Sequence, residues 1–349
     1  MKLKLFLTFD HELPLGKLKT SYEDSLFKPS QKVMDVANEA GVKVTFFTDI
    51  LCGIRFKEWD YTNFYLPYRD QLINALRDHH DVQLHTHPHW LTTKYENGTY
   101  LPSTDFALSD FKNDLDVGGI SGIIKLGIDG LQEIITPIFQ DYECIAYRAG
   151  GFNISPLTKE IFEALYTHGI RYDSSIARGH YFKSSISKID FRKLPKAGNW
   201  YINPENYHTA SLLPNIFEIP IATIPKTPFE IPTKFKLKKY SNRAQTNNGE
   251  VIHSKDQTNL FTKLLMLSSS RILTFDNYTY SLEYLLRIVD YNVNKYKSCD
   301  TLMFSIISHP KTMCDYSFIL MKRFIQEVQN KYPSAEFTTF SQLHKSIKQ

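Results

Sequence analysis

Three histidines stand within five residues, in the run His85-Thr86-His87-Pro88-His89. Neutral imidazole is a common zinc ligand, and two histidines with one carboxylate leave coordination positions open for water and substrate. His85 and His89 could meet on one metal ion, and His87 would share their side if the chain stayed extended. Pro88 predicts a bend, so the pattern leaves open which two histidines bind. Because the run follows an apolar strand, a metal site is favoured over a cluster of exposed histidines.

Two carboxylates end the first expected strand, in the run Thr8-Phe9-Asp10-His11-Glu12. Asp10 and Glu12 share a face if the strand continues through them, and His11 then points away. One carboxylate can ligate a metal while the other acts as a general base. Capping of the following turn is the simpler alternative, and the histidines elsewhere in the chain favour the chemical role.

Polar residues also follow three later expected strands. They form the runs Tyr147-Arg148-Ala149-Gly150-Gly151-Phe152-Asn153, Tyr172-Asp173-Ser174-Ser175 and Ser308-His309-Pro310-Lys311. In a parallel α/β fold the C-terminal ends of the strands point to one rim, where the loops that follow them form the site. We therefore expect a catalytic mouth at that rim.

Short β-rich runs alternate with helical stretches, which is the pattern of parallel βα units. Strands are expected at residues 2–10, 42–48, 81–86, 143–147, 171–174 and 301–308, and helices at residues 29–41, 67–79, 120–139, 157–168, 278–297 and 315–331, with a strand–helix pair over 335–347. These units indicate a barrel-like α/β domain, although the pattern alone does not separate a barrel from an open sheet. Residues 176–260 are less regular, with short strands at 200–202 and 217–222 and a mobile loop at 246–257.

Composition limits the classes of function. The net charge of +4 on 349 residues is too small to indicate a nucleic-acid-binding protein. No window approaches the ~18 apolar residues that span a bilayer. The N-terminal run alternates like a strand and does not resemble a secretory leader. The four cysteines show no paired spacing, which favours free thiols and a cytoplasmic location.

The order of these motifs resembles that of the polysaccharide deacetylases with NodB homology, carbohydrate esterase family four. Thr8-Phe9-Asp10 is similar to the start of the family's first motif, Thr-Phe-Asp-Asp. The run His85 to His89 fits the second motif, His-Ser/Thr-x-x-His. Arg148-Ala149-Gly150-Gly151-Phe152 resembles the third, and Ile307-Ser308-His309 is similar to the last. Each motif is short, but four occur in order over nearly the whole chain.

This resemblance implies a distorted (β/α) barrel of about seven strands, built by one catalytic domain over residues 1–349 with an irregular insertion around 176–260. It implies a divalent metal, zinc by default, held by His85, His89 and a carboxylate of the first strand. The implied partner is an acylated saccharide, with no nucleic acid and no membrane span.

The resemblance also implies roles for single residues. Asp10 matches the base, Arg148 the residue that holds the base, and His309 the acid that protonates the leaving amine. Backbone N–H groups near Gly151 and Phe152 would stabilise the tetrahedral oxyanion. Asp173 matches the fourth motif only loosely and would orient an active-site group.

Two departures from the family pattern affect these assignments. His11 replaces the second Asp of the first motif, and strand geometry favours Glu12 over His11 as the metal ligand, so His11 and His87 are alternates. The third motif has Gly-Gly where Pro is common, as in a branch that resembles deacetylases of surface-polysaccharide synthesis. Trp90, directly after the histidines, either stacks on a sugar ring or packs at the rim.

Three functions remain open at this point. The first is removal of an N-acetyl or related acyl group from a saccharide during cell-surface polysaccharide synthesis. The second keeps the barrel and the metal but hydrolyses another non-peptide C–N bond, in a formamide or a small cyclic amide. The third is a non-catalytic carbohydrate-binding relative, which the intact set of base, ligands and acid disfavours.

Overall fold

A curved sheet of nine strands forms the centre of the molecule, in a computed structural model that describes residues 1–16, 18–184, 187–227, 260–277 and 281–348. Its strands are paired in the order β10-β11-β7-β6-β3-β2-β1-β14, with β15 also pairing with β1. The pairings are parallel except that between β10 and β11. The strands are β1 (Lys2–His11), β2 (Thr45–Asp49), β3 (Asp81–Thr86), β6 (Ala146–Ala149), β7 (Tyr172–Asp173), β10 (Trp200–Tyr201), β11 (Phe217–Glu218), β14 (Thr301–Ser308) and β15 (Ala335–Phe337).

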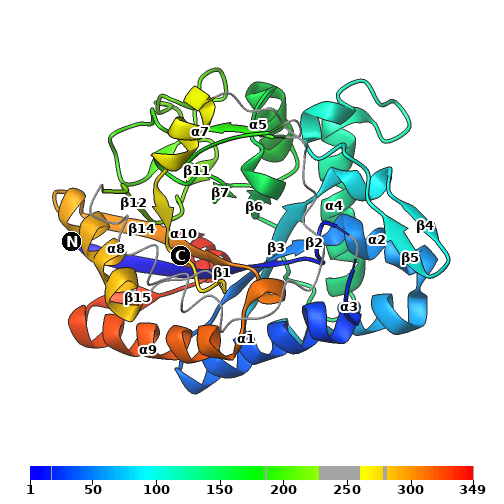
Figure 1. The fold of residues 1–349 in the computed structure, drawn as a ribbon, viewed down its shortest axis with the longest axis horizontal. Helices are drawn as coiled ribbons and strands as arrows, with labels where there is room; N and C mark the ends of the chain where they lie inside the picture. Colours follow the sequence, from blue (N-terminus) through cyan, green and yellow to red (C-terminus); the bar gives the residue numbers. More distant parts are fainter. Residues whose placement is uncertain (17, 185–186, 228–259, 278–280, 349) are drawn as a thin grey trace.

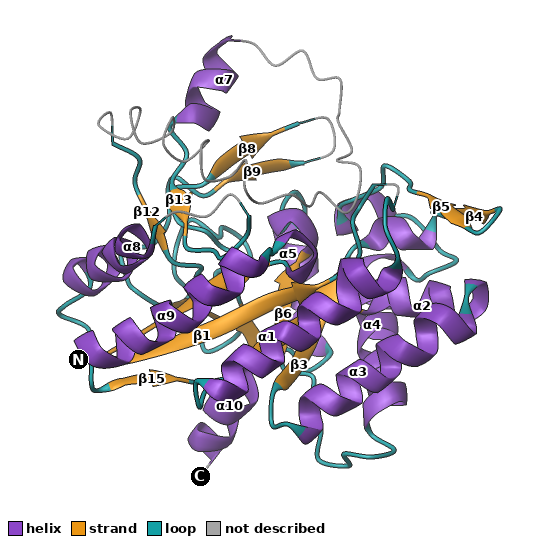
Figure 2. Ribbon diagram, turned by 60° about the horizontal axis from the view of Figure 1, so that its bottom comes forward, coloured by secondary structure: helices purple, strands orange, loops and turns teal. Residues whose placement is uncertain are grey.

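Helices cover the outside of this sheet, and Figure 1 shows α1 and α9 side by side along one edge of the molecule. The helices are α1 (Lys28–Glu39), α2 (Ile50–Trp59), α3 (Leu66–Arg77), α4 (Gly119–Ile135), α5 (Thr158–Thr167), α7 (Leu260–Leu267), α8 (Leu282–Lys295), α9 (Asp315–Lys331) and α10 (Phe340–Lys348). Three two-stranded pairs lie outside the main sheet, namely β4 (Lys94–Glu96) with β5 (Thr99–Leu101), β8 (Tyr181–Lys183) with β9 (Lys188–Asp190), and β12 (Thr223–Ile224) with β13 (Arg271–Ile272). Figure 2 shows the last two pairs on the same side of the molecule as α7. No helix among the described residues is both long and apolar enough to cross a membrane.

The two ends of the sheet approach each other. The chain that continues β11 makes a parallel bridge from Ile221 to Ala177 on one side and to Ser305 of β14 on the other. Backbone hydrogen bonds from Ala222 to Ser305 and from Ser305 to Pro220 support this closure. The predicted distorted (β/α) barrel is therefore confirmed.

The period of two along β1 divides its side chains between the inside of the barrel and the helices. Leu5, Leu7 and Phe9 belong to the large core under the helices, whereas Phe6 belongs to a separate buried cluster. That second cluster includes Phe340 of α10, whose ring centroid lies 4.8 Å from that of Phe6. Because alternate residues of a strand share a face, Thr8, Asp10 and Glu12 continue the side of Phe6 into the barrel. The barrel interior is thus apolar where α10 packs and polar towards the C-terminal end of β1.

The sequence predicted several elements to the residue, including β3, β14 and α9. It missed α2, which starts directly after β2 and buries apolar residues on more than one side, so that helical periodicity is weak. Within the described part of the predicted insertion at 176–260 there are short strands and α7 begins at its end. The loop expected at residues 246–257 lies outside the described residues, and the division into domains stays a prediction.

A buried carboxyl pair on neighbouring strands gives a test of the fold. Asp173 and Glu218 stand directly opposite each other in the β7–β11 register, and both are fully buried. Burial raises the pKa of both groups, and the negative charge of Asp173 raises the pKa of Glu218 further, well above its ordinary value. A carboxyl group with a raised folded-state pKa favours folding below its unfolded-state pKa, and this contribution is lost as the pH rises through the folded-state value.

We therefore expect Glu218→Gln to stabilise the protein at pH 8, on the order of 1–3 kcal/mol, because a glutamate that is ionised in the unfolded chain must be buried either as a charge or with uptake of a proton, whereas a glutamine of the same shape needs neither. At pH 5 the variant and the wild type should differ less. Chemical denaturation at both pH values measures the effect, with the exposed Glu327→Gln on α9 as the control. An identical effect of Glu218→Gln at both pH values would contradict the assignment.

Candidate active site

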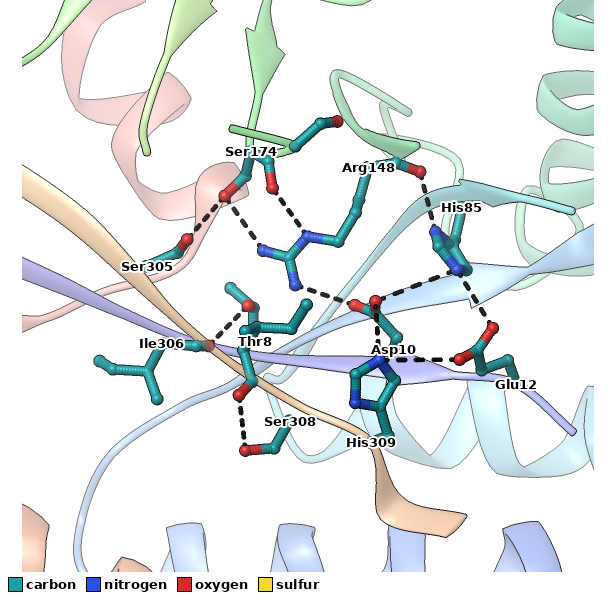
Figure 3. A network of polar contacts seen from close by, with 12 residues as sticks. Thr8, Asp10, Glu12, His85, Arg148, Ser174, Ser305, Ile306, Ser308 and His309 are labelled. Atoms are coloured by element: carbon teal, nitrogen blue, oxygen red, sulfur yellow. Dashed lines mark hydrogen bonds and ion pairs between the residues drawn. The ribbon is translucent and has the colours of Figure 1, made fainter. Parts of the chain in front are cut away.

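The first strand directs Asp10 and Glu12 into the barrel (Figure 3). His11 points out of the barrel, towards α3. His11 Nε2 lies 2.8 Å from Gln71 Oε1 on α3, and its ring packs beside Tyr68. Burial lowers the pKa of His11 to about 4, so the imidazole is neutral at physiological pH. The structure therefore keeps His11, an alternate metal ligand from the sequence, away from the other candidate ligands.

The histidine run turns only after His87. This residue is still extended, with φ −115° and ψ 91°, and the 3-10 helix η3 (Pro88–Leu91) follows it. His87 therefore shares the side of His85, whereas the turn carries His89 into an aromatic environment. The His89 ring lies 4.7 Å from that of Phe106 and 4.9 Å from that of Trp90, and neither of its nitrogens has a hydrogen-bond partner among the described residues. Burial and the neighbouring His87 lower the pKa of His89 well below its ordinary value.

Glu12, His85 and His87 form the one group of at least three potential ligands that the described residues bring together, with ligand atoms all within 4.8 Å of one another. Glu12 Oε2 lies 3.4 Å from His85 Nε2 and 2.5 Å from His87 Nε2. All three side chains are buried. In this grouping His87 takes the place that the sequence analysis assigned to His89, because the chain stays extended for two residues beyond His85 and then bends.

Neighbouring groups fix the positions of His85 and His87. The Nδ1–H of His85 donates to the carbonyl oxygen of Arg148 at 2.8 Å, which leaves Nε2 free to accept or to bind a metal. The backbone N–H of His87 donates to Asp49 Oδ1 at 3.2 Å. Gly150 lies against the other edge of the His87 ring, where an added Cβ would stand 2.7 Å from Nδ1 and 2.4 Å from the carbonyl oxygen of Thr86. A side chain at position 150 would therefore displace His87.

Lys311 compensates the charge of Glu12. Its Nζ lies 2.8 Å from Glu12 Oε1 and donates to the carbonyl oxygen of Leu13 at 3.0 Å. Burial alone would raise the pKa of Glu12, but the charges of Lys311 and His87 hold it well below its ordinary value. Glu12 is therefore an anion, as a metal ligand must be. The sequence analysis did not assign a role to Lys311, although it stands two residues after His309.

Arg148 holds the second carboxylate, Asp10. This guanidinium is completely buried, and its Nη1 donates to Asp10 Oδ1 at 2.9 Å. Its Nε and Nη2 donate to the backbone carbonyl and hydroxyl oxygens of Ser174, at 2.8 and 3.0 Å. Its flat face covers the ring of Phe47 at 4.4 Å. Arg148 therefore fixes which oxygen of Asp10 remains free for chemistry.

His309 and Asp276 form a dyad on the far side of Asp10. The backbone N–H and the Nδ1–H of His309 donate to the two carboxylate oxygens of Asp276, at 2.8 and 2.9 Å. The Nε2 of His309 faces Asp10 Oδ2 at 3.6 Å and Glu12 Oε1 at 3.8 Å. Burial alone would lower the pKa of His309, but Asp276, Asp10 and Glu12 raise it to about 9. Its side chain is 24% exposed, so the site meets solvent at this residue.

Asp276 was missed in the sequence, although a signal for it exists. The run Thr274-Phe275-Asp276 repeats the Thr-Phe-Asp of residues 8–10 after an apolar stretch. The repeated motif ends beside β13 rather than at a strand of the main sheet.

The remaining predicted residues lie near this centre in other roles. Asp173 accepts from the hydroxyl of Ser175 at 2.7 Å, and that hydroxyl oxygen accepts from the backbone N–H of Ala149 at 2.8 Å, so Asp173 supports the strand of Arg148. Trp90 is completely buried and donates from its indole N–H to Asp49 at 2.6 Å, so it packs instead of presenting a face to a sugar. Gly151 and Phe152 follow β6 with φ values of 58° and 61°, and their role at an oxyanion stays a prediction.

Comparisons with known proteins place the fold. No family model matches the sequence, and no curated protein matches it in sequence. A solved structure of a candidate polysaccharide deacetylase from Mycobacterium smegmatis is similar, with a TM-score of 0.51, 12% identity, and coverage of 99% of this chain and 90% of that chain. The structure of Puue allantoinase is similar with a TM-score of 0.52, 10% identity, and coverage of 98% and 89%. At these identities the similarity establishes a shared fold over nearly the whole chain.

The dyad gives a test of the site's electrostatics. Asp276→Asn should lower the pKa of His309 from about 9 by roughly 1–3 units, because it removes the nearest negative charge while burial remains. NMR titration of the His309 ring, in protein freed of metal with a chelator, measures this value. Asp290→Asn, at a carboxylate that pairs with Lys331 on the surface, should leave it unchanged. An unchanged titration of His309 in Asp276→Asn would show that the dyad does not form.

Proposed function

We propose that this protein is a metal-dependent hydrolase that removes an N-acetyl or related acyl group from a saccharide. The observation that carries the proposal is the buried Glu12–His85–His87 group beside a carboxylate held by Arg148 and a histidine held by Asp276. The similar fold of a candidate polysaccharide deacetylase supports it. A role in cell-surface polysaccharide synthesis and a cytoplasmic location belong to the same proposal, the latter supported by the four unpaired cysteines.

The donor set fits a divalent metal ion, with zinc as the proposed one. Two imidazoles and one carboxylate are a common set for catalytic zinc and leave positions open. The groups that contact these ligands fit as well, since the carbonyl of Arg148 orients His85 and Lys311 keeps Glu12 ionised. Zinc held by these three residues would supply Lewis acidity towards the acyl carbonyl oxygen. His89 is outside this proposed set, because after the turn at Pro88 its ring packs on Phe106 and lies 5.6 Å from the ring of His87.

The protein's own groups then divide the proton transfers. Asp10 Oδ1 is bound to Arg148, so Oδ2 is the oxygen that takes a proton from the attacking water. His309 presents Nε2 to the same space and, when protonated, can give its proton to the leaving amine. Asp276 holds the ring through Nδ1 and favours the protonated form. Backbone N–H groups of Gly151 and Phe152 are the proposed donors to the oxyanion.

A second candidate is hydrolysis of a small cyclic amide. The structure of Puue allantoinase has as high a TM-score as the deacetylase structure, and its name gives allantoin as the substrate. The same base, acid and ligands serve both reactions, because each breaks a non-peptide C–N bond. Substrate choice therefore separates the two candidates.

The experiment that decides is turnover of a substrate panel by the full chain, with metal content measured in parallel. We expect acetate release from at least one N-acetylated saccharide, and loss of this activity with a chelator and its recovery with zinc. Hydrolysis of allantoin or a formamide alone would select the second candidate. A protein free of metal and inactive on the whole panel would indicate the non-catalytic alternative.

Asp10→Asn should lower turnover by roughly 10²–10⁴-fold, because it removes the base and keeps the volume. Asp35→Asn on the exposed face of α1 is the matched control and should retain full activity. Steady-state kinetics on the best substrate of the panel measures both variants. Comparable activity in Asp10→Asn and Asp35→Asn would remove Asp10 from the mechanism.

Gly150→Ala tests the ligand set without touching a ligand. The added methyl group would collide with His87, so zinc affinity should fall roughly 10–100-fold, as it does when outer-shell support is lost. Competition with a chelating dye measures the affinity. Gly98→Ala, in the turn between β4 and β5, meets nothing within 4 Å and strains only the local backbone at φ 74°, so it should bind zinc normally. Unchanged zinc affinity in a folded Gly150→Ala protein would favour ligands other than His87.

A further inference from the structure

A second cavity, of about 560 Å³, lies away from the candidate active site. Its walls come from the segment after β7, the chain that follows β9, the β12–β13 pair and the last turns of α8. Figures 1 and 2 both show α8 towards the N-terminal end of β1, whereas Asp10 and Glu12 stand at the other end of that strand. The cavity shares no lining residue with the Glu12–His85–His87 group or the His309–Asp276 dyad.

The charged side chains among the described lining residues are all cationic. Arg178, Arg192, Lys196 and Lys295 all line the cavity, and no acidic residue is among the described residues that do so. The charge of Arg192 is balanced, because its Nε and Nη2 donate to the two oxygens of Asp190 at 2.8 and 2.7 Å. Three positive charges remain to be accounted for.

The groups that contact Arg178 and Lys295 are neutral, and the buried Glu218 is the acidic group that acts on Arg178 from further away. Arg178 donates from Nη1 and Nη2 to the backbone carbonyl oxygens of Pro195 and Ala197, at 2.6 and 2.9 Å. Lys295 lies over the rings of two tyrosines, Tyr291 at 5.4 Å and Tyr296 at 5.3 Å. Neither Lys196 nor Lys295 forms an ion pair with a described carboxylate. The cavity therefore gathers three positive charges that form no ion pair with a described carboxylate.

Positive charges that lie this close together repel one another. Partial burial lowers the pKa of Lys295, and the like charge of Arg178 lowers it further. An anion in the cavity would remove this repulsion and would meet cations from three separate segments of the chain. Guanidinium and ammonium donors bind both carboxylates and phosphates, and a phosphate group carries more charge and one more acceptor oxygen than a carboxylate, so it can meet cations from all three segments at once.

We propose that this cavity binds a small molecule that carries a phosphate group. Its volume falls within the range of small-ligand sites and exceeds what a single phosphate needs. The rings of Tyr291 and Tyr296 would contact the remainder of the ligand, while Lys295, Lys196 and Arg178 face the phosphate. The inference is independent of the metal and of the hydrolase proposal.

The test uses the full chain with three probes: inorganic phosphate, pyrophosphate and glucose 6-phosphate. Calorimetry and thermal shift are run at constant ionic strength with a chelator present, and glucuronate serves as a carboxylate of similar size. We expect saturable binding of at least one phosphate probe, which also shows whether the free ion or the sugar phosphate is preferred. Tighter binding of glucuronate than of every phosphate probe would overturn the proposal.

Matched variants locate the binding. The double variant Lys196→Gln with Lys295→Gln changes two exposed side chains and should weaken phosphate binding at least tenfold. Lys297→Gln, an exposed lysine two residues beyond Lys295 that does not line the cavity, should bind as the wild type does. Equal binding by the double variant and the wild type, or no binding of any probe by the wild type, would refute the site.

Discussion

The buried contact between Arg148 and Asp10 is the interaction on which the candidate site depends. Removing an arginine and an aspartate from water costs several kcal/mol per ion, and the pair is tolerable only where other hydrogen bonds complete its geometry. Here Ser174 accepts two of the remaining guanidinium hydrogens, and its hydroxyl contacts Ser305 of β14 at 2.7 Å. The carbonyl oxygen of the same Arg148 orients His85. One residue of β6 thus links Asp10 of β1, His85 of β3 and the chain that follows β7.

The two-residue period of β1 explains why this network faces inward. The barrel contains an apolar layer at Phe6, a hydroxyl at Thr8, and then two carboxylates. Thr8 donates to the carbonyl oxygen of Ile306 at 2.7 Å, so the strand pair β1–β14 is joined immediately below Asp10 (Figure 3). The side chains inside the barrel therefore become more polar towards the rim. The carboxylates lie above Thr8, whose hydroxyl already has a hydrogen-bond partner. A shift of β1 by one residue would exchange Glu12 for His11 and dismantle the site.

The sequence pattern predicted correctly those features that depend only on residues close together in the chain. Strand alternation placed Glu12 inside and His11 outside, and the apolar runs located β3 and β14. The pattern could not choose between His87 and His89, because that depends on where the chain bends relative to Pro88. The roles of Asp276 and Lys311 could not be predicted from local sequence, because their partners are distant in the chain. Asp276 binds His309, 33 residues away, and Lys311 binds Glu12, 299 residues away. The sequence alone did not separate stacking of Trp90 on a sugar from packing at the rim, because that depends on its contacts with Phe56 and Tyr100 in the folded chain.

Asp10 and Glu12, the two carboxylates inside the barrel, are held in the same way, each with one oxygen bound to a cation. Asp10 gives Oδ1 to Arg148 and turns Oδ2 towards His85 and His309, at 4.0 and 3.6 Å. Glu12 gives Oε1 to Lys311 and turns Oε2 towards His85 and His87. In each case a cation fixes one oxygen, so the other is presented singly to the space between the strands. This arrangement distinguishes the proposed tasks of the two carboxylates, since Oδ2 of Asp10 faces His309 and Oε2 of Glu12 faces the imidazoles of His85 and His87.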